Sequence, residues 1–159
     1  MKKLSIYCSI AFFLAACGSG AGDNSAQTSD QAAAGSGTEK SISDYDPNRG
    51  EGKFTDVKLD AGLNARMAVQ GEKVADLKCV SCHKLTDERL VGPGWKGVTQ
   101  RHQPEWIMNF MTNTDAMIDK DPKVQAMLEI CMVRMPNQNL SDEDARNILE
   151  FMRKNDGVK

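Results

Sequence analysis

The stretch Cys79-Val80-Ser81-Cys82-His83 decides how the rest of this chain is interpreted. Two cysteines three residues apart on a helical turn place both sulfur atoms on one side, where they can reach the two vinyl groups of a single haem. A histidine directly after the second cysteine can then turn its imidazole onto the iron. The segment therefore predicts one covalently attached haem c, bound through Cys79 and Cys82, with His83 as an axial ligand.

Two other uses of a cysteine pair fit these surroundings less well. A thioredoxin-like pair lies at the N-terminus of a helix after a strand, where the helix dipole lowers the thiol pKa, whereas this pair ends a predicted helix. A structural zinc ion needs four ligands, and only His102 and Cys131 remain as further soft donors in the mature chain. Zinc and a redox disulfide are the alternatives to haem. Cys131 is interpreted as a small buried apolar side chain, with a thiolate ligand or redox switch as the alternative.

The N-terminus predicts export. Residues 1–3 are short and cationic, and the apolar run 4–16 is shorter than the about 20 residues that a permanent transmembrane helix needs. The run ends in Leu14-Ala15-Ala16-Cys17, which resembles a bacterial lipobox and implies cleavage before Cys17 and a lipid on its thiol. An ordinary signal peptide cut near Ala16 is the alternative. Export agrees with the haem prediction, because c-type haem is attached outside the cytoplasmic membrane.

The chain after the predicted signal peptide (residues 1–16) divides into three parts. Residues 17–44 comprise Cys17 and a Gly-, Ser- and Ala-rich linker with too little apolar surface to fold. Residues 45–59 are predicted to form an irregular arm, and residues 60–159 the haem domain. Removing the two lysines of the signal leaves 18 basic and 22 acidic side chains, and no basic patch typical of nucleic-acid binding is present.

The domain shows helical spacing and no alternation typical of strands, so the predicted fold class is all-α. Ser141 is the expected N-cap of the last helix, because three acidic residues follow it at the positive end of the helix dipole. Residues 91–94 are predicted as a loop, and residues 113–116 are loop-like. Helices are predicted over residues 61–82, from Pro104 through Met111, from Pro122 through Cys131, and from Ser141 to about Lys154.

The dipeptide Met135-Pro136 marks the second predicted iron ligand. Proline disfavours helical geometry in the residue before it, so Met135 is expected on an extended loop just ahead of the last helix. There its thioether can cross the open face of the haem. Met132, Met117 and His102 are the alternative ligands.

In their order along the chain, these motifs resemble those of a small class I bacterial cytochrome c. The motifs are Gly71 on a helix that ends in the haem motif, Gly92-Pro93, Met135-Pro136 and a capped helix that contains Phe151. The resemblance covers about residues 60–154 and implies N- and C-terminal helices that cross around one haem, with Gly71 giving room near Phe151.

The same resemblance implies contacts inside the haem pocket. The Pro93 carbonyl would accept a hydrogen bond from the His83 ring, which fixes the tautomer and the orientation of the imidazole. Arg101 or Trp106 would approach a haem propionate. The residues implied to line the pocket are Trp95, Val98 and Trp106.

Two protein ligands on the iron, His83 and Met135, leave no open position for a substrate, and a thioether ligand favours the ferrous state. The sequence therefore predicts a mono-haem electron carrier rather than an enzyme, lipid-anchored in the periplasm or cell envelope. The expected partners are a quinol-oxidising respiratory complex as donor and a terminal oxidase or exported reductase as acceptor. The alternatives are a haem-bearing subunit fixed in a larger complex, and a haem sensor or enzyme with an open distal site.

Overall fold

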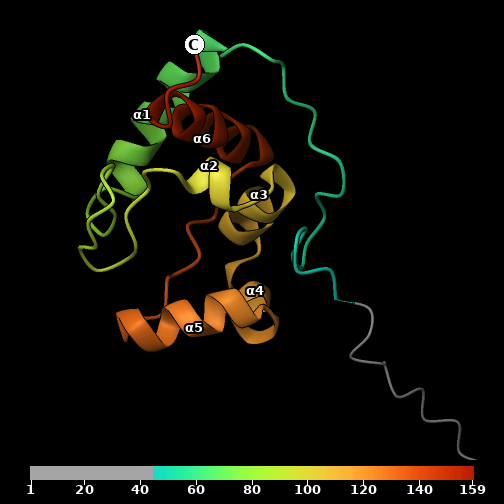
Figure 1. The fold of residues 1–159 in the computed structure, drawn as a ribbon, viewed down its shortest axis with the longest axis vertical. Helices are drawn as coiled ribbons and strands as arrows, with labels where there is room; N and C mark the ends of the chain where they lie inside the picture. Colours follow the sequence, from blue (N-terminus) through green and yellow to red (C-terminus); the bar gives the residue numbers. More distant parts are fainter. Residues whose placement is uncertain (1–44) are drawn as a thin grey trace, which may run out of the picture. The chain divides into compact units, whose positions relative to one another are not determined.

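The computed structural model describes residues 45–159 and shows six helices joined by turns and irregular segments (Figure 1). Residues 45–159 contain no strand, which confirms the all-α prediction, and none of their helices is long and apolar enough to span a bilayer. The predicted signal peptide, Cys17 and linker lie outside the described residues. The helices are α1 (Ala65–Lys78), α2 (Val98–Arg101), α3 (Pro104–Thr112), α4 (Thr114–Lys120), α5 (Pro122–Cys131) and α6 (Asp142–Asn155).

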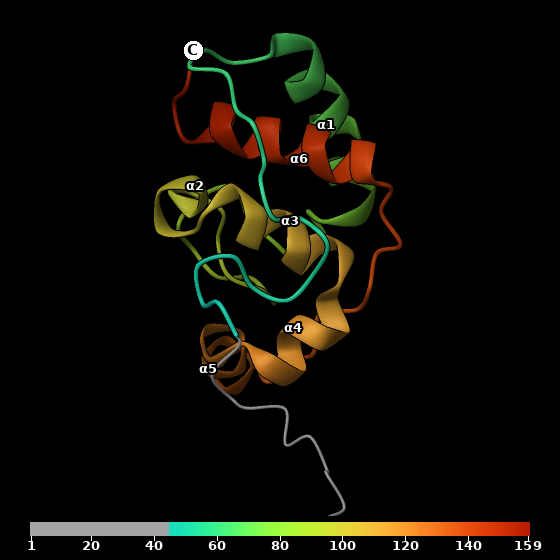
Figure 2. The ribbon, with the colours of Figure 1, turned by 90° about the vertical axis from the view of Figure 1, so that its right-hand side faces the viewer.

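Helices α1 and α6 pack directly against each other, as Figures 1 and 2 both show. A side chain at Gly71 would overlap the Asn147 carbonyl and would place its Cβ 2.8 Å from the Ile148 nitrogen. Only glycine permits this approach of two backbones. The resemblance placed Gly71 near Phe151, but its closest contact is with α6 one turn earlier, while Phe151 packs edge-on against Trp95 at 6.3 Å.

Helix α1 is shorter than predicted at both ends. It begins after Asn64, whose side chain accepts a hydrogen bond from the Met67 nitrogen at 3.1 Å, so the cap lies later than the predicted start at residue 61. It ends at Lys78 with Cys79 as its C-cap, and the amides of Cys82 and His83 both donate to the Cys79 carbonyl. The haem motif therefore lies on a turn that directly follows the helix, and the prediction of a helix through residue 82 is wrong.

Helix α6 is the predicted last helix, with Ser141 accepting a hydrogen bond from the Asp144 amide at 3.0 Å. Its Glu150 carboxylate is 1% exposed and accepts hydrogen bonds from Arg146 and Arg153, each at 2.7 Å. Burial alone raises the pKa of Glu150. The hydrogen bonds from the two arginines lower it by a larger amount, so the pKa lies below its usual value. Arg153 also donates to the Asp60 carbonyl, so this network ties α6 to the segment before α1.

Helices α3 and α5 begin at Pro104 and Pro122 as predicted, but α4 was not expected. The loop-like segment 113–116 in fact starts α4 at Thr114, because that threonine and the following Met117 are fully buried against neighbouring helices. Tertiary burial thus stabilises a helix too short to be stable alone. Helix α5 packs against α4 and ends at Cys131, and its C-cap Met132 adopts left-handed backbone geometry.

The arm (residues 45–59) contains no helix or strand and lies against α3 and α4 (Figure 2). Phe54 and Val57 are partly buried against the core. The arm therefore belongs to the packed structure, although it has no regular secondary structure of its own.

Candidate haem site

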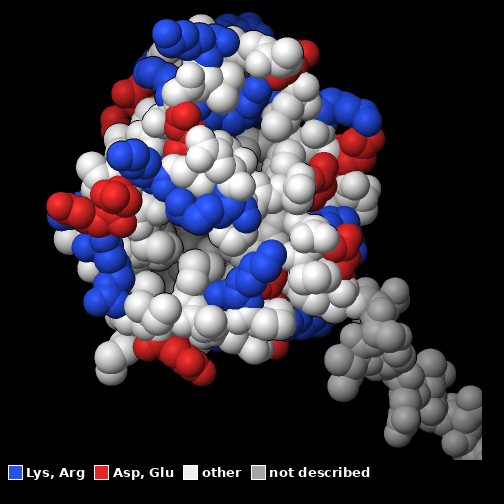
Figure 3. All heavy atoms as spheres, viewed as in Figure 1, with Lys and Arg blue, Asp and Glu red and all other residues white. Residues whose placement is uncertain are grey.

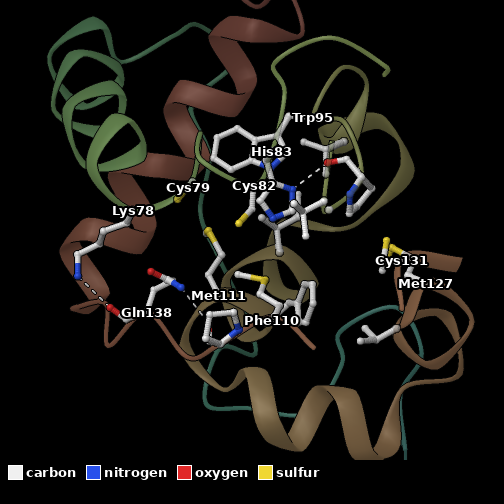
Figure 4. Close-up of a pocket in the computed structure, with 18 of the residues that line it drawn as sticks. Lys78, Cys79, Cys82, His83, Trp95, Phe110, Met111, Met127, Cys131 and Gln138 are labelled. Carbon is white, nitrogen blue, oxygen red and sulfur yellow. Dashed lines mark hydrogen bonds between the residues drawn. The ribbon is translucent and has the colours of Figure 1, made fainter. Parts of the chain in front are cut away.

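A cavity of about 490 Å³ lies between the turn after α1, the loop before α2, and helices α3 and α5. Figure 4 shows Cys79, Cys82, His83 and Trp95 on one side of it, with Phe110 and Met111 across from them. Every residue of the described chain that the sequence placed around the haem lines this cavity: Cys79, Cys82, His83, Pro93, Trp95, Val98, Arg101, Trp106 and Met135.

The two cysteines of the motif are free thiols at the edge of the cavity. Cys79 is 7% exposed and Cys82 is partly exposed, and burial raises the pKa of the Cys79 thiol to about 11. The turn that joins the cysteines brings both sulfur atoms to the same cavity. This is the arrangement that two thioether bonds to one porphyrin require.

His83 is fixed in orientation by its loop. Its Nδ1 atom lies 2.8 Å from the Pro93 carbonyl oxygen, so the implied hydrogen bond is present. That carbonyl can only accept, so Nδ1 carries the proton and Nε2 keeps its lone pair for a metal. Burial lowers the pKa of His83, which favours the neutral ring that binds iron. A Cβ at Gly92 would lie 2.8 Å from Nδ1, so this loop must be glycine where it crosses the ring.

The structure separates the four candidates for the second iron ligand. Met135 and His102 line the cavity, whereas Met132 and Met117 do not. Met132 is 87% exposed, and Met117 is fully buried with its sulfur 3.0 Å from the Glu51 nitrogen of the arm. Of these four candidates, only Met135 and His102 can therefore reach a group in the cavity.

His102 stacks face to face on Trp106, with ring centroids 3.8 Å apart. Burial, with help from the positive charges of Lys123 and Arg101, lowers its pKa to about 4. Its Nδ1 atom is buried without a hydrogen-bond partner among the described residues. The stack aligns the imidazole with the indole of Trp106, which favours a role in packing the cavity wall.

The two candidates for a propionate contact differ in the donors that they still have free. The indole nitrogen of Trp106 donates to the Asp121 carboxylate at 2.7 Å, so its one N–H group is already used. The Arg101 guanidinium donates to the carbonyls of Lys96 and Gly94 and keeps further N–H groups. Arg101 is therefore the better candidate for a propionate.

Sequence reasoning missed several residues of the cavity, above all Met111. This side chain is 6% exposed and lies across the cavity from His83 (Figure 4). Its position on the apolar face of α3 looks like ordinary core spacing, so no sequence signal distinguishes it. Cys131 also lines the cavity as a partly buried free thiol, and Met127 lies one helical turn before it. Met111, Met127 and Met135 all line the cavity from this side of the molecule. We therefore call α3, α4, α5 and the segment 132–140 together the methionine wall.

The cavity fits a covalently attached haem. Its volume is within the about 300–1,000 Å³ typical of cofactor sites, and its wall is mostly apolar and aromatic. Two thiols and an oriented imidazole occupy one end of it, with thioethers across from them. A zinc site is not supported, since no group of three or more His, Cys, Asp or Glu side chains in residues 45–159 could hold a metal ion.

Comparisons with known proteins identify the family. The family model described as Cytochrome c matches residues 68–156. The solved cytochrome c from Rhodothermus marinus is 37% identical, with a TM-score of 0.64 over 66% of this chain and 90% of that chain. Two structures of its engineered form Rma TDE are each 36% identical over the same shares. Their TM-scores are 0.63, and 0.60 for the one bound to the carbene intermediate (1-ethoxy-1-oxopropan-2-ylidene).

No curated protein sequence matches the chain significantly. The family match spans more than half of the chain and contains the cysteine pair, the histidine and most of the cavity wall. The chain therefore belongs to the cytochrome c family, as a haem-based electron carrier with one covalently bound haem c.

Proposed function

We propose that Cys79 and Cys82 carry the haem, that His83 and Met135 ligate its iron, and that a lipid on Cys17 tethers the protein to a membrane. The observation that carries the ligand assignment is the shared cavity, with an oriented His83 ring and Met135 in its wall. In this role the protein passes electrons from a quinol-oxidising respiratory complex to a terminal oxidase or exported reductase.

The haem, when bound, supplies a one-electron ferrous–ferric couple. His83 and Met135 would hold the iron of this group: the Pro93 carbonyl keeps the Nε2 lone pair of His83 toward the cavity, and Pro136 keeps Met135 on an extended segment. With both residues bound to the iron in either oxidation state, electron transfer would need little rearrangement of the protein. The surrounding apolar wall keeps water from the redox centre.

Carbon monoxide tests whether the iron is closed. A ferrous protein with both protein ligands in place should bind carbon monoxide slowly and weakly at neutral pH. Rapid binding together with a high-spin spectrum would instead support the haem sensor or enzyme with an open distal site.

The tether is tested in the bacterial envelope. The wild type should fractionate with membranes and yield a lipid-modified N-terminal cysteine by mass spectrometry, whereas the Cys17→Ala protein should be released. Cys8→Ala is the matched control and should stay anchored, because Cys8 leaves with the signal peptide. A stoichiometric protein that copurifies after mild detergent extraction would favour the fixed subunit over the shuttle.

The charge around the cavity suits an acidic partner. The charged residues that line it, apart from histidines, are Lys78, Arg101 and Arg134, and no acidic residue of the described chain lines it. On the face shown in Figure 3, basic side chains border the central hollow, whereas acidic side chains lie mostly near the outline of the molecule. The chain as a whole has a net charge of −2. Because Arg134 is paired with Asp115 and Asp119, we infer that electrons enter through the positive surface at Lys78 and Arg101, with exposed Leu77 beside it.

The reaction with a small charged oxidant shows whether the local charge around the cavity or the net charge of the protein governs the encounter. Oxidation of the ferrous protein by anionic ferricyanide should slow as ionic strength rises, because salt screens an attraction to the positive surface. If the net charge governs the encounter, the rate should instead increase with ionic strength.

A further inference from the structure

The arm is bound by side chains of the methionine wall. The Asn109 carboxamide of α3 donates to the Arg49 and Phe54 carbonyls, at 3.0 and 2.9 Å, and accepts from the Phe54 nitrogen at 2.9 Å. Asn113 donates to the Glu51 carbonyl at 3.0 Å. Because Asn109 is fully buried, its polar groups depend on the arm for their hydrogen bonds.

Two glycines give the arm its close fit to these helices. A Cβ at Gly50 would lie 2.6 Å from the Met117 sulfur, and a Cβ at Gly52 would overlap the Asn109 side-chain oxygen. The Glu51 nitrogen donates to the same Met117 sulfur. The arm therefore has one close-packed position on α3 and α4, and no side chain can be added at either glycine without displacing it.

The arm, α5 and the cavity wall meet at one carboxylate. Asp121 is fully buried and caps α5, where one of its oxygens accepts from the amides of Lys123 and Val124 at 2.7 and 3.0 Å. Its other oxygen accepts from the Trp106 indole at 2.7 Å and from the Tyr45 hydroxyl. No Lys, Arg or His among residues 45–159 forms an ion pair with Asp121, so these four donors alone compensate its buried charge.

Helix α5 has few fully buried contacts that hold it in place, since Met127 and Leu128 are only partly buried against the core and the hydrogen bond from Arg89 to the Ile130 carbonyl is exposed. Val124 is its one buried residue, and Ile130 near its end is 65% exposed. Of the other helices, α5 packs chiefly against α4. Since α5 leads directly into the segment that contains Met135, a movement of α5 pulls on that segment, which Arg134 otherwise ties to Asp115 and Asp119 of α4 only through exposed ion pairs.

We propose that the arm restrains the methionine wall: Tyr45 and Asp121 are positioning residues that, by holding α5 to Trp106, keep Met135 on the iron and keep external ligands out. This inference rests on the proposed ligation by Met135. The family match begins at residue 68, so the arm lies outside the residues that the family model matches.

Imidazole binding to the ferric full-length holoprotein measures the restraint. Imidazole must replace the methionine, so its apparent dissociation constant equals the intrinsic constant divided by the fraction of molecules whose methionine wall is open. Tyr45→Phe removes one hydrogen bond to a charged group and should lower the apparent constant about three- to tenfold. Gly52→Ala displaces the arm from Asn109 and should lower it further.

A matched control separates this restraint from general stability. Asn64→Ala removes the N-cap of α1, on the other side of the molecule's core, and should cost about as much stability as Tyr45→Phe. It should leave imidazole affinity unchanged. Unchanged affinity in both arm variants, or the same increase in Asn64→Ala as in Tyr45→Phe, would overturn the proposal.

Amide exchange gives a readout that does not depend on the iron ligand. The amides of Lys123, Val124 and the rest of α5 should exchange faster in Tyr45→Phe, while those of α6 should not change. Equal protection of α5 in both proteins would overturn the role of the arm. A ferric spectrum that lacks methionine ligation in the wild type would contradict the proposed function instead, and α5 exchange would still decide the role of the arm.

Discussion

The α1–α6 crossing and helix α5 are stabilised in different ways. In the crossing, two helices pack backbone to backbone at Gly71, and α6 buries most of its residues, including the paired Glu150 and Arg153. Helix α5 buries only Val124, and its cavity-facing side is partly buried. The polypeptide alone completes the first region, whereas the second depends on the haem and on the arm.

This difference assigns different roles to the two proposed iron ligands. Helix α1 leads directly into the turn with Cys79 and His83, so the histidine and both haem attachments follow from the well-packed region. Met135 follows the less well-packed α5. We therefore expect the histidine side to stay rigid during redox cycling and the methionine side to be the one that opens.

The largest expected effect on stability comes from adding a side chain at the α1–α6 contact. Gly71→Ala places a Cβ against the Asn147 backbone, which cannot move without separating the helices, and should cost about 4 kcal/mol or more of unfolding free energy. Urea unfolding of the holoprotein measures this. Gly62→Ala is the control, because its Cβ would meet nothing closer than 3.5 Å. Equal stability of the two variants would show that the crossing is looser than described.

Removing the buried charge of α6 should have the next largest effect. Glu150→Gln leaves Arg146 and Arg153 without their carboxylate and should cost roughly 3 kcal/mol at pH 7. Glu72→Gln, in an exposed pair with Lys154, should cost at most about 1 kcal/mol.

The effect of Glu150→Gln should depend on pH in one direction. The folded-state pKa of Glu150 lies below its usual 4.5, so its ionised form stabilises the fold above about pH 4.5, and that contribution is lost as pH falls through the folded-state pKa. The difference between wild type and Glu150→Gln should therefore narrow on acidification from pH 5 to pH 3. A constant difference over this range would contradict the role of the carboxylate.

A smaller effect needs no substitution. In native-state hydrogen exchange of the wild-type holoprotein, the amides of α5 should open at a free energy roughly 2 kcal/mol below those of α1 and α6. Uniform protection across the three helices would remove the distinction between the two regions.

Much of the fold follows from local signals in the sequence. Pro104, Pro122 and Ser141 each mark the start of a helix, since proline at the first position and a serine cap act through their own backbone and side chain. Helix α4 could not be predicted in this way, because it forms through burial of Thr114 and Met117 by distant parts of the chain. The start of α1 was misplaced because Asn64 was not recognised as its cap.

The residues of the candidate site divide in the same way, into those that local sequence predicts and those that only tertiary packing brings together. The cysteines, His83 and Pro93 lie on one short turn and loop, and their spacing predicts their meeting. Met111 reaches the cavity, and the carboxylate of Asp121 reaches the Trp106 indole behind the cavity wall, only through tertiary packing, so the sequence gives no sign of either role. The arm is irregular in the structure as well, and its hydrogen-bond partners could not be predicted because they lie far away along the chain.

The near-infrared spectrum of the ferric protein tests the central claim most directly, since a sulfur-to-iron charge-transfer band appears there only with a methionine on the iron. The wild type and Met111→Leu should both show this band, because Met135, and not Met111, is the proposed ligand. Met135→Ala should lose the band and bind imidazole without competition. A Met135→Ala protein that keeps the band, or a Met111→Leu protein that loses it, would contradict the assignment of Met135.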